Sequence, residues 1–318
     1  MMQDLFSVPS CFSAGEKLPD VPAPSSATRS GQSAVTLVYR AGIAGHDRLV
    51  TVTWCRNLLT HGLSVSIEGS AGGGKDKSAR EWGEAGGADG GCGGAKQGCS
   101  SACKVEMQPW HFWRKYGAKQ FQVDGKAIDV VWDLRSARYS DEPKPLSDYY
   151  VAVVSGEEVV LLLGNLKKEA FRRTGSRPSL QDAVLVCKKE HVFSKKRFLT
   201  KARFHEKGKL HDISIECSSS NLGGGGGGGV DVDMVIKIDG SVNVLVRHLQ
   251  WKFRGNECIS INQLKVQVYW DAHDWLFGTG MRNALFIFKP EPPSASADFH
   301  SSDECSDFCL FLYAWKVE

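Results

Sequence analysis

Histidines followed directly by aspartate are the residues of this chain whose types and spacing most resemble catalytic chemistry. They occur at His46, His211 and His273. An aspartate can orient a histidine as a general base or metal ligand, but both roles need a nucleophile or further ligands in the same place. The surrounding segments have strand or turn patterns that supply neither. We therefore weigh a turn or cap role for His273 against a role in a binding site.

A glycine-rich stretch, Gly69–Asp76, nearly spells a phosphate-binding loop. Asp76 replaces the hydroxyl residue that would bind Mg²⁺, and no helix pattern follows to present its N-terminal amides. Cysteines outside the expected strands lack the close pairs typical of structural zinc sites. These are Cys92, Cys99, Cys103, Cys305 and Cys309. We predict neither a metal nor an organic cofactor.

Basic residues are concentrated between Cys187 and Lys209, where nine Lys or Arg accompany two Glu. On one face of a hairpin they would form a strip able to contact the phosphates of RNA or of an anionic membrane. The alternative is a solvated strand face above an apolar core. The candidate basic surface consists of Lys188, Lys189, Lys195, Lys196, Arg197, Lys201 and Arg203.

Tryptophan is frequent, with nine in the chain. Such large side chains either fill a core or line a cavity, and in both settings the indole N–H needs a partner. A cavity between two halves of the protein, ringed by tryptophans with an arginine at its mouth, is the ligand site these residues suggest. Its candidate residues are Arg247, Trp251, Arg254, Trp270, His273 and Trp275.

An internal resemblance relates two of the tryptophan segments. Trp113–Asp133 aligns without a gap with Trp251–Asp271, and both segments begin with Trp and end with Trp-Asp. A glycine falls at the same place in each, at Gly117 and Gly255. Self-similarity of this kind is typical of repeated structural units. We therefore predict a duplicated β unit.

Strand patterns, alternating or rich in β-branched residues, dominate the rest of the chain. The sequence predicts an all-β fold of antiparallel strands in two similar tandem halves, each a sandwich or half-open barrel, with one short helix between them. The apolar stretch Cys309–Trp315 is either an edge strand or a chance pattern. The expected organisation is a disordered tail at 1–32, a first β half at 33–165 with a glycine-rich insertion at 69–102, a helical linker at 166–180, a second β half at 181–289 with a glycine-rich loop at 218–229, and a tail at 290–318.

Composition is that of an ordinary globular protein: 318 residues, 42% apolar and 24% charged, with a formal net charge of +3. A charge so near zero argues against a dedicated nucleic-acid binder. No apolar run approaches the roughly 18 residues that a membrane-spanning helix needs, and the first residues lack the pattern of a secretory signal. We expect reduced cysteines and a cytoplasmic or nuclear protein that is not secreted.

Several longer segments resemble a known protein family. They are DVVWDLRSARY (129–139), YYVAVVSGEEVVLLLG (149–164), RHLQWKFRGNECISI (247–261) and VQVYWDAHDWLFGTGMRNALFIF (266–288). By these segments the chain resembles the plant-specific family catalogued as domain of unknown function 868, from about Ala34 to Phe288. The glycine-rich insertions and Cys309–Trp315 fall outside this resemblance. It implies no activity, substrate or cofactor for any residue.

A binding role is the function that these patterns favour. No set of residues supplies a nucleophile, a base and an oxyanion donor together, so we expect a non-enzymatic β-rich module that binds a protein partner. The alternative is a binder of a small apolar or lipid-like ligand held between the two halves. An anionic lipid would suit the basic strip, and we do not expect nucleic acid as a partner.

Overall fold

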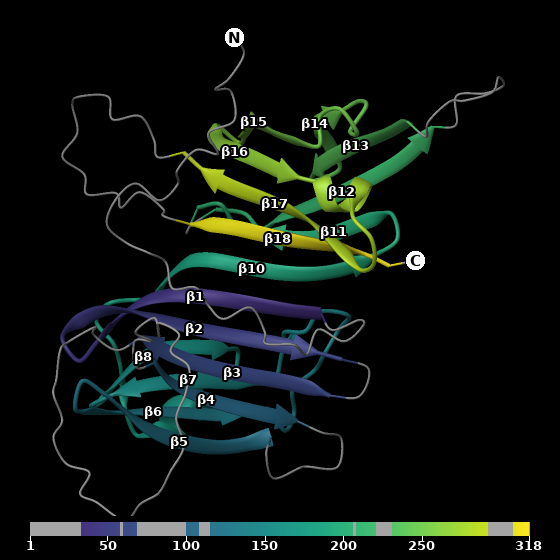
Figure 1. Cartoon of the computed structure of the whole chain (residues 1–318). Helices are drawn as coiled ribbons and strands as arrows, with labels where there is room; N and C mark the ends of the chain where they lie inside the picture. Colours follow the sequence, from purple (N-terminus) through teal and green to yellow (C-terminus); the bar gives the residue numbers. More distant parts are fainter. Residues whose placement is uncertain are drawn as a thin grey trace, which may run out of the picture.

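Strands dominate the computed structural model, as the alternating patterns predict, so the prediction of an all-β protein is confirmed. The structure describes residues 33–57, 60–68, 100–107, 115–205, 208–220, 231–291 and 308–317. These residues form three sheets of nine, four and five strands. The first half of the chain occupies one side of the molecule and the second half the other (Figure 1).

All pairs are antiparallel except β10 with β18 and β8 with β9. The nine-stranded sheet has the order β15 (Arg254–Ile261), β16 (Leu264–Asp271), β17 (Arg282–Pro290), β18 (Cys309–Lys316), β10 (Val184–Ser194), β1 (Ser33–Ile43), β2 (His46–Arg56), β3 (His61–Glu68) and β4 (Ser100–Met107). The five-stranded sheet has the order β5 (Tyr116–Val123), β6 (Lys126–Asp133), β7 (Tyr150–Ser155), β8 (Glu158–Gly164) and β9 (Arg177–Pro178). The four-stranded sheet has the order β11 (Arg197–Ala202), β12 (His211–Ser220), β13 (Asp231–Ile238) and β14 (Ser241–Val246).

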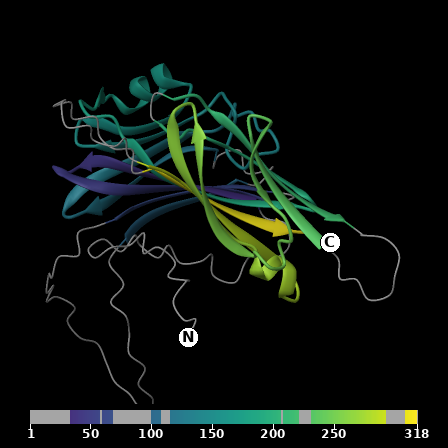
Figure 2. The same ribbon diagram turned by 90° about the horizontal axis from the view of Figure 1, so that it is seen from above.

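Both small sheets cover the same face of the nine-stranded sheet. Tyr39 on β1 is paired with Leu185 on β10, so these two side chains point to the same side. Tyr39 packs on the core between β1–β3 and β5–β8, whereas Leu185 packs on the core between β11–β14 and β15–β18. Each half therefore has its own core, and the β1–β10 pairing joins the two into one sheet. The sheet is twisted, so that β1 and β16 run in different directions in Figure 2.

Two short helices accompany the sheets in the described part of the chain. α1 (Lys167–Thr174) forms where a helix was expected, with Ala170 fully buried and Gly175 ending the helix at a φ of 66°. α2 (His273–Phe277) was not predicted. Its five residues are too few to show the periodicity by which a helix is recognised.

The two tryptophan segments form hairpins in the same register. Gly117 pairs with Trp132 across β5–β6, and Gly255 pairs with Trp270 across β15–β16. A Cβ atom on Gly117 would lie 2.9 Å from the Trp132 ring, and one on Gly255 would lie 2.4 Å from the Trp270 ring. Glycine is needed at both positions because the facing indole lies directly over it.

The turns of these hairpins also agree. Asp124 and Gly125 have φ values of 50° and 76°, and Asn262 and Gln263 have values of 47° and 71°. Two consecutive positive φ values are what a type I′ turn requires. The Asp-Gly sequence predicts this turn in the first half, whereas Asn-Gln adopts the same turn in the second half without glycine.

The structure corrects the expected tail at 290–318. Cys309–Lys316 forms β18, which lies between β10 and β17 rather than at an edge. Leu310, Leu312 and Ala314 have no exposed surface, and they alternate with partly exposed residues. Two smaller corrections concern the glycine-rich segments, since β4 begins at Ser100 and β12 continues to Ser220. The expected tail at 1–32 and most of both glycine-rich segments lie outside the described residues.

Candidate functional site

Two of the tryptophans expected to line a ligand cavity lie in the core of the second half. Trp270 and Trp275 are 8% and 7% exposed. Their Nε1–H groups donate to the carbonyl oxygens of Lys252 at 3.0 Å and Ala314 at 2.7 Å. Trp275 also stacks on Phe198, with ring centroids 4.9 Å apart. Both indoles are therefore used within the fold.

The other expected cavity residues lie on the surface. Trp251 is 82% exposed, and Arg247 is exposed beyond the end of β14. Arg254 is also exposed, and its Nε lies 2.9 Å from Asp271 Oδ2. The structure thus does not gather the candidate residues around one cavity. It separates them into a buried pair and a surface group.

Three aromatic rings lie beside this surface group. We define the aromatic patch as Phe253, His273 and Phe277 together with Trp251, which stands two residues before Phe253 in the chain. The rings of Phe253, His273 and Phe277 contact one another, with centroids between 5.3 and 5.6 Å apart. Phe277 is 53% exposed. The backbone N–H of Ala272 donates to the carbonyl of Phe253, which holds the β14–β15 connection beside α2. His273 Nδ1 lies 3.0 Å from Asp274 Oδ1, and its own N–H donates to Asp271, as in a turn or cap.

Two residues of the predicted basic strip, both on β11, are paired with acidic residues of the neighbouring strand β12. β11 alternates between exposed and buried residues, and Arg197 and Lys201 point outward. Arg197 Nε lies 3.1 Å from Glu216, and Lys201 Nζ lies 3.3 Å from Asp212. Glu216 also accepts from Lys237, at 2.8 Å, so this group keeps one surplus positive charge.

Other members of the strip have different surroundings. Lys188 is mostly buried, and its Nζ lies 2.8 Å from Glu190 Oε2 and donates to Thr200 Oγ1 at 3.2 Å. The Thr200 hydroxyl donates to the same carboxylate. Burial and repulsion from Lys188 lower the pKa of Lys144, which comes from the first half. This second-half cluster therefore lies near Lys144 of the first half.

The remaining basic residues are spread over two faces. Lys189 lies over the Phe311 ring, 5.8 Å from its centroid, on the uncovered face of the large sheet. Lys195, Lys196 and Arg203 are exposed. No single basic face results, so the strip predicted from the sequence is divided.

A groove of about 820 Å³ runs between the two halves. One wall is the loop 141–143 of the first half, and the other is formed by β10 and the outward face of β11–β13. Glu190, Thr200, Arg197 and Lys201 border it, so part of the predicted basic surface lines this groove. Its apolar lining comes from Pro143, Val192, Phe193, Leu199 and Ile213.

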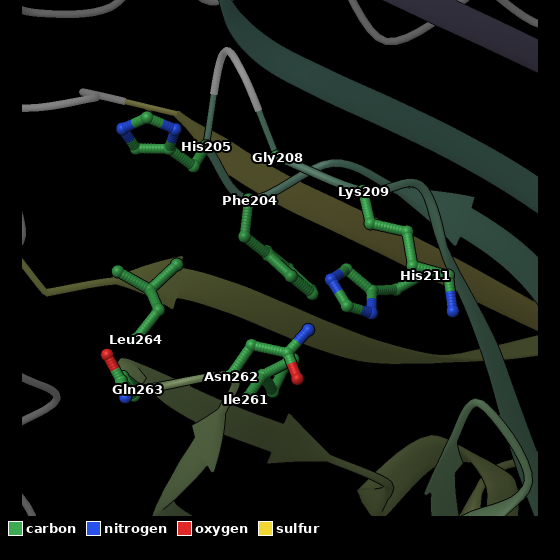
Figure 3. A pocket seen from close by; sticks show the side chains of 9 residues that line it. All are labelled: Phe204, His205, Gly208, Lys209, His211, Ile261, Asn262, Gln263 and Leu264. Atoms are coloured by element: carbon green, nitrogen blue, oxygen red, sulfur yellow. The ribbon is translucent and has the colours of Figure 1, made fainter.

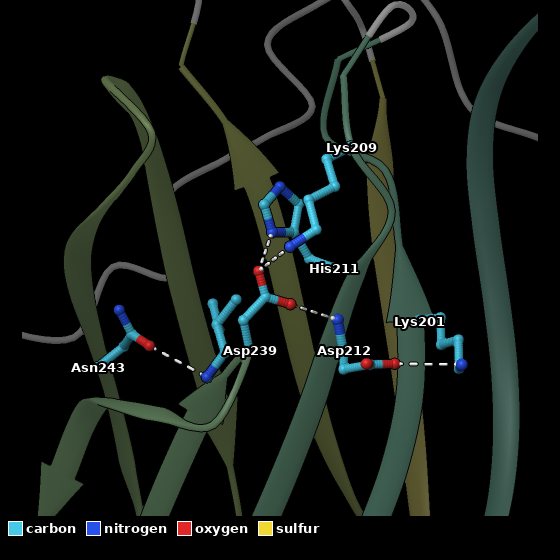
Figure 4. Close-up of polar contacts among 7 residues, drawn as sticks. Lys201, Lys209, His211, Asp212, Asp239 and Asn243 are labelled. Atoms are coloured by element: carbon cyan, nitrogen blue, oxygen red, sulfur yellow. Dashed lines mark hydrogen bonds and ion pairs between the residues drawn. The ribbon is translucent and has the colours of Figure 1, made fainter.

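A histidine–aspartate pair lies beside a second hollow, at the end of the four-stranded sheet. His211 is 5% exposed, and its Nδ1 lies 2.9 Å from Asp239 Oδ2 (Figure 4). Asp239 also accepts the backbone N–H of Asp212 at 3.0 Å, and Lys209 Nζ lies 3.4 Å from its carboxylate. The Asp212 N–H bond, with the contacts to His211 and Lys209, holds the pKa of the Asp239 carboxyl below its usual value.

The sequence suggests the adjacent Asp212 as the partner of His211, but the partner in the structure is Asp239. The step His211-Asp212 places the two side chains on opposite faces of β12, since neighbouring residues of a strand alternate. The actual partner, Asp239, lies in the β13–β14 turn and has a φ of 50°. Asp239-Gly240 predicts that turn but not which strand end it reaches, because that depends on the pairing of β12 with β13.

Fold and site together define an all-β protein of two joined halves with surface hollows. Comparison with protein families matches residues 30–316 to "Plant protein of unknown function (DUF868)". The chain therefore belongs to this family, as the sequence resemblance predicts. The match extends beyond Phe288 through β18, so Cys309–Trp315 lies inside the family pattern rather than outside it.

Further comparisons add two facts. No curated protein and no solved structure matches the chain. Within the residues that the structure describes, no helix is long and apolar enough to cross a membrane.

Proposed function

We propose that this protein is a non-enzymatic interaction module that binds a protein partner through the aromatic patch. The observation that carries the proposal is the 82% exposure of Trp251. Tryptophan, phenylalanine and arginine are enriched where protein interfaces carry most of their binding energy. Trp251 and Phe277 are both more than half exposed, and burying these aromatic side chains in a partner would be favourable.

Charge around the patch favours an acidic partner. Arg247 and Lys252 are exposed, and among the described residues neither has an ion-pair partner. Arg254 lies over the Phe253 ring while it contacts Asp271. We therefore propose a partner segment with apolar anchor residues flanked by Asp or Glu, because opposite charges around an apolar centre speed association and fix orientation.

Site-specific photocrosslinking tests this proposal. A benzophenone amino acid at position 251 is expected to trap one protein from plant extract, and the same residue at Leu180, which is 94% exposed, is expected to trap none. The crosslinked segment should be acidic, and as a synthetic peptide it should bind the unmodified chain. Trp251→Ala should weaken that binding at least about tenfold, as loss of an interface anchor does. Equal capture at both positions, or a peptide indifferent to Trp251→Ala, would contradict the proposal.

A second candidate function is supported by the groove between the halves. Its volume of about 820 Å³ lies within the range of about 300–1,000 Å³ typical of small-molecule sites. Leu199, 54% exposed, contributes an apolar side chain to its wall. A small apolar or lipid-like ligand would suit these walls.

Native mass spectrometry with added laurate tests this second candidate. A one-to-one complex is expected with the unmodified protein and a much weaker one with Leu199→Glu, which puts a charge into the groove. Leu245→Glu is the matched control, since Leu245 is 48% exposed on β14 and does not border the groove. Equal laurate binding by both variants would exclude the groove as the site.

We further propose that the two tryptophan hairpins are copies of one ancestral unit. The shared register of Gly117–Trp132 and Gly255–Trp270 and the matching turns support this origin. A chimera in which residues 254–271 replace residues 116–133 should fold, because the glycine and the indole stay opposite each other. Failure of this chimera to fold under conditions in which the unmodified chain folds would argue against equivalence.

A further inference from the structure

The bond between His211 and Asp239 fixes the proton on the histidine ring. A carboxylate only accepts hydrogen bonds, so His211 Nδ1 carries the hydrogen that it donates to Asp239 at 2.9 Å. In the neutral ring Nε2 then has a free lone pair. Among the described residues this nitrogen has no hydrogen-bond partner. The ring is held in place by Phe204, whose centroid lies 5.9 Å away.

The imidazole borders a hollow of about 380 Å³, with Phe204, His205, Gly208 and Lys209 on one side and the β15–β16 turn on the other (Figure 3). Its apolar lining comes from Phe204, Ile261 and Leu264. Lys209 lies at the rim, close to the same carboxylate as His211. The hollow thus combines an apolar wall, one buried hydrogen-bond acceptor and one cation.

In the first half, the β5–β6 turn is equivalent to the β15–β16 turn, and its charged side chains are engaged in contacts with the β1–β2 hairpin. There Arg48 of β2 forms an ion pair with Asp124, and Lys126 donates to the carbonyl of Ala44 at 2.9 Å. The β5–β6 turn is therefore tied to the neighbouring β1–β2 turn by charged side chains. At the β15–β16 turn, Asn262 and Gln263 border the hollow instead.

We infer that this hollow binds a small phenolic ligand, with the phenol O–H donated to His211 Nε2 and its ring against Phe204, Ile261 and Leu264. The volume accommodates one or two rings. A phenol suits the site better than an aliphatic alcohol, because its more acidic hydroxyl makes a stronger hydrogen bond to the imidazole nitrogen. An ether of the same shape lacks the proton and leaves Nε2 unpaired, which costs binding.

Binding of 4-methylphenol and of its methyl ether, 4-methylanisole, to the full chain tests this assignment. Titrations followed by the histidine ring signals in NMR are expected to show the phenol binding at least about tenfold more tightly than the ether, the difference expected for about 1.4 kcal/mol. His211→Asn should remove this preference. His248→Asn is the matched control, because His248 forms a surface pair with Asp231 at 2.6 Å that borders neither hollow.

Filling the hollow with a larger side chain provides a test that does not depend on changing His211. Leu264→Trp should weaken phenol binding while leaving the His211 signals in their native positions. The inference is overturned if phenol and ether bind equally to the unmodified protein, if His211→Asn keeps the preference while folded, or if Leu264→Trp binds as tightly as the unmodified chain.

Discussion

Glycine and tryptophan act as pairs in the two hairpins. At Gly255 a side chain would have to enter the space held by the Trp270 indole, whose N–H is already fixed on Lys252. The glycine is therefore required by its neighbour, although neither residue shows this requirement when the sequence is read along one strand.

Replacing Gly255 by alanine should destabilise the protein by about 1–3 kcal/mol, the usual cost of overpacking. Gly117→Ala should cost less, because its added Cβ would lie 2.9 Å from the facing ring rather than 2.4 Å. Urea unfolding of both variants measures the difference. Ser260→Ala, at an exposed position of the same β15 strand, is the control and should change the stability little. A reversed order of the two glycine variants would contradict the packing described here.

His191 gives the protein a dependence on pH. Its Nδ1 accepts the Nε1–H of Trp315 at 3.0 Å, and its ring stacks on Tyr313. Burial lowers the pKa of His191 below 6.5; Lys189 acts in the same direction and Glu190 opposes it. The folded state thus resists protonation of this ring.

The free energy of unfolding should fall as the pH drops below 6.5 and should level off below the lowered pKa of the folded state, because the unfolded chain binds the proton first. His191→Asn offers an oxygen to Trp315 but does not titrate. Urea unfolding at pH 7.5, 6.5 and 5.5 should therefore show a smaller loss of stability for this variant. A residual loss is expected from His61, whose pKa is also lowered by burial. Equal losses in both proteins would exclude His191 as a contributor.

Among the elements, β18 shows how position in the sheet differs from position in the sequence. It is separated from β17 by residues 291–308, yet it pairs with β17 on one side and β10 on the other. Its inward residues belong to the core of the second half. An edge strand would contribute much less buried surface.

Leu312→Ala is expected to destabilise the second half by about 2–5 kcal/mol, as for other fully buried leucines. Leu312 has no exposed surface, whereas Lys316 at the end of the same strand is exposed. Lys316→Ala is therefore the control, with little expected change. Thermal or urea unfolding would detect the difference, and equal stabilities would mean that β18 is not held in the core.

For the whole molecule, the important feature is the sheet that both halves share. β1 and β10 pair over Ala34–Arg40, and we call this pairing the seam. A substitution that breaks the seam should therefore disturb the cores of both halves. Breaking a strand within one half, such as β3, should leave the other half intact, because among the described strands β3 pairs only with β2 and β4.

Leu37→Pro should expose amides in both halves to hydrogen exchange, because Leu37 lies between Val52 of β2 and Lys188 of β10 and proline removes a ladder hydrogen bond. Val65→Pro in β3 should loosen β2 while β10 stays protected. Hydrogen exchange read by mass spectrometry distinguishes the two patterns. If the β10 amides of the Leu37→Pro variant stay fully protected from hydrogen exchange, the β1–β10 pairing does not link the stability of the two halves.

Local patterns in the sequence predict the strands, α1 and the tight turns, because alternation and Asp-Gly steps act within a few residues. They do not predict which strand ends meet. Asp239 reaches His211, and β18 reaches β10, only after the sheets have formed. Trp251 and Trp270 are the same residue type in one predicted segment, yet one is exposed and the other buried. Trp251 lies in a turn, whereas Trp270 packs against the facing Gly255. Neither relation can be read from the positions of the tryptophans in the sequence.

The position of β18 also affects how the protein is made. During synthesis all the other strands of the large sheet leave the ribosome before β18 does, so until then β10 and β17 each lack one of the strands with which they pair. Unpaired edges of this kind accept strands from other chains. Nascent copies held close together on one messenger RNA are therefore at risk of exchanging β18, and a chaperone that shields the edge of β10 until β18 has been made would prevent this exchange.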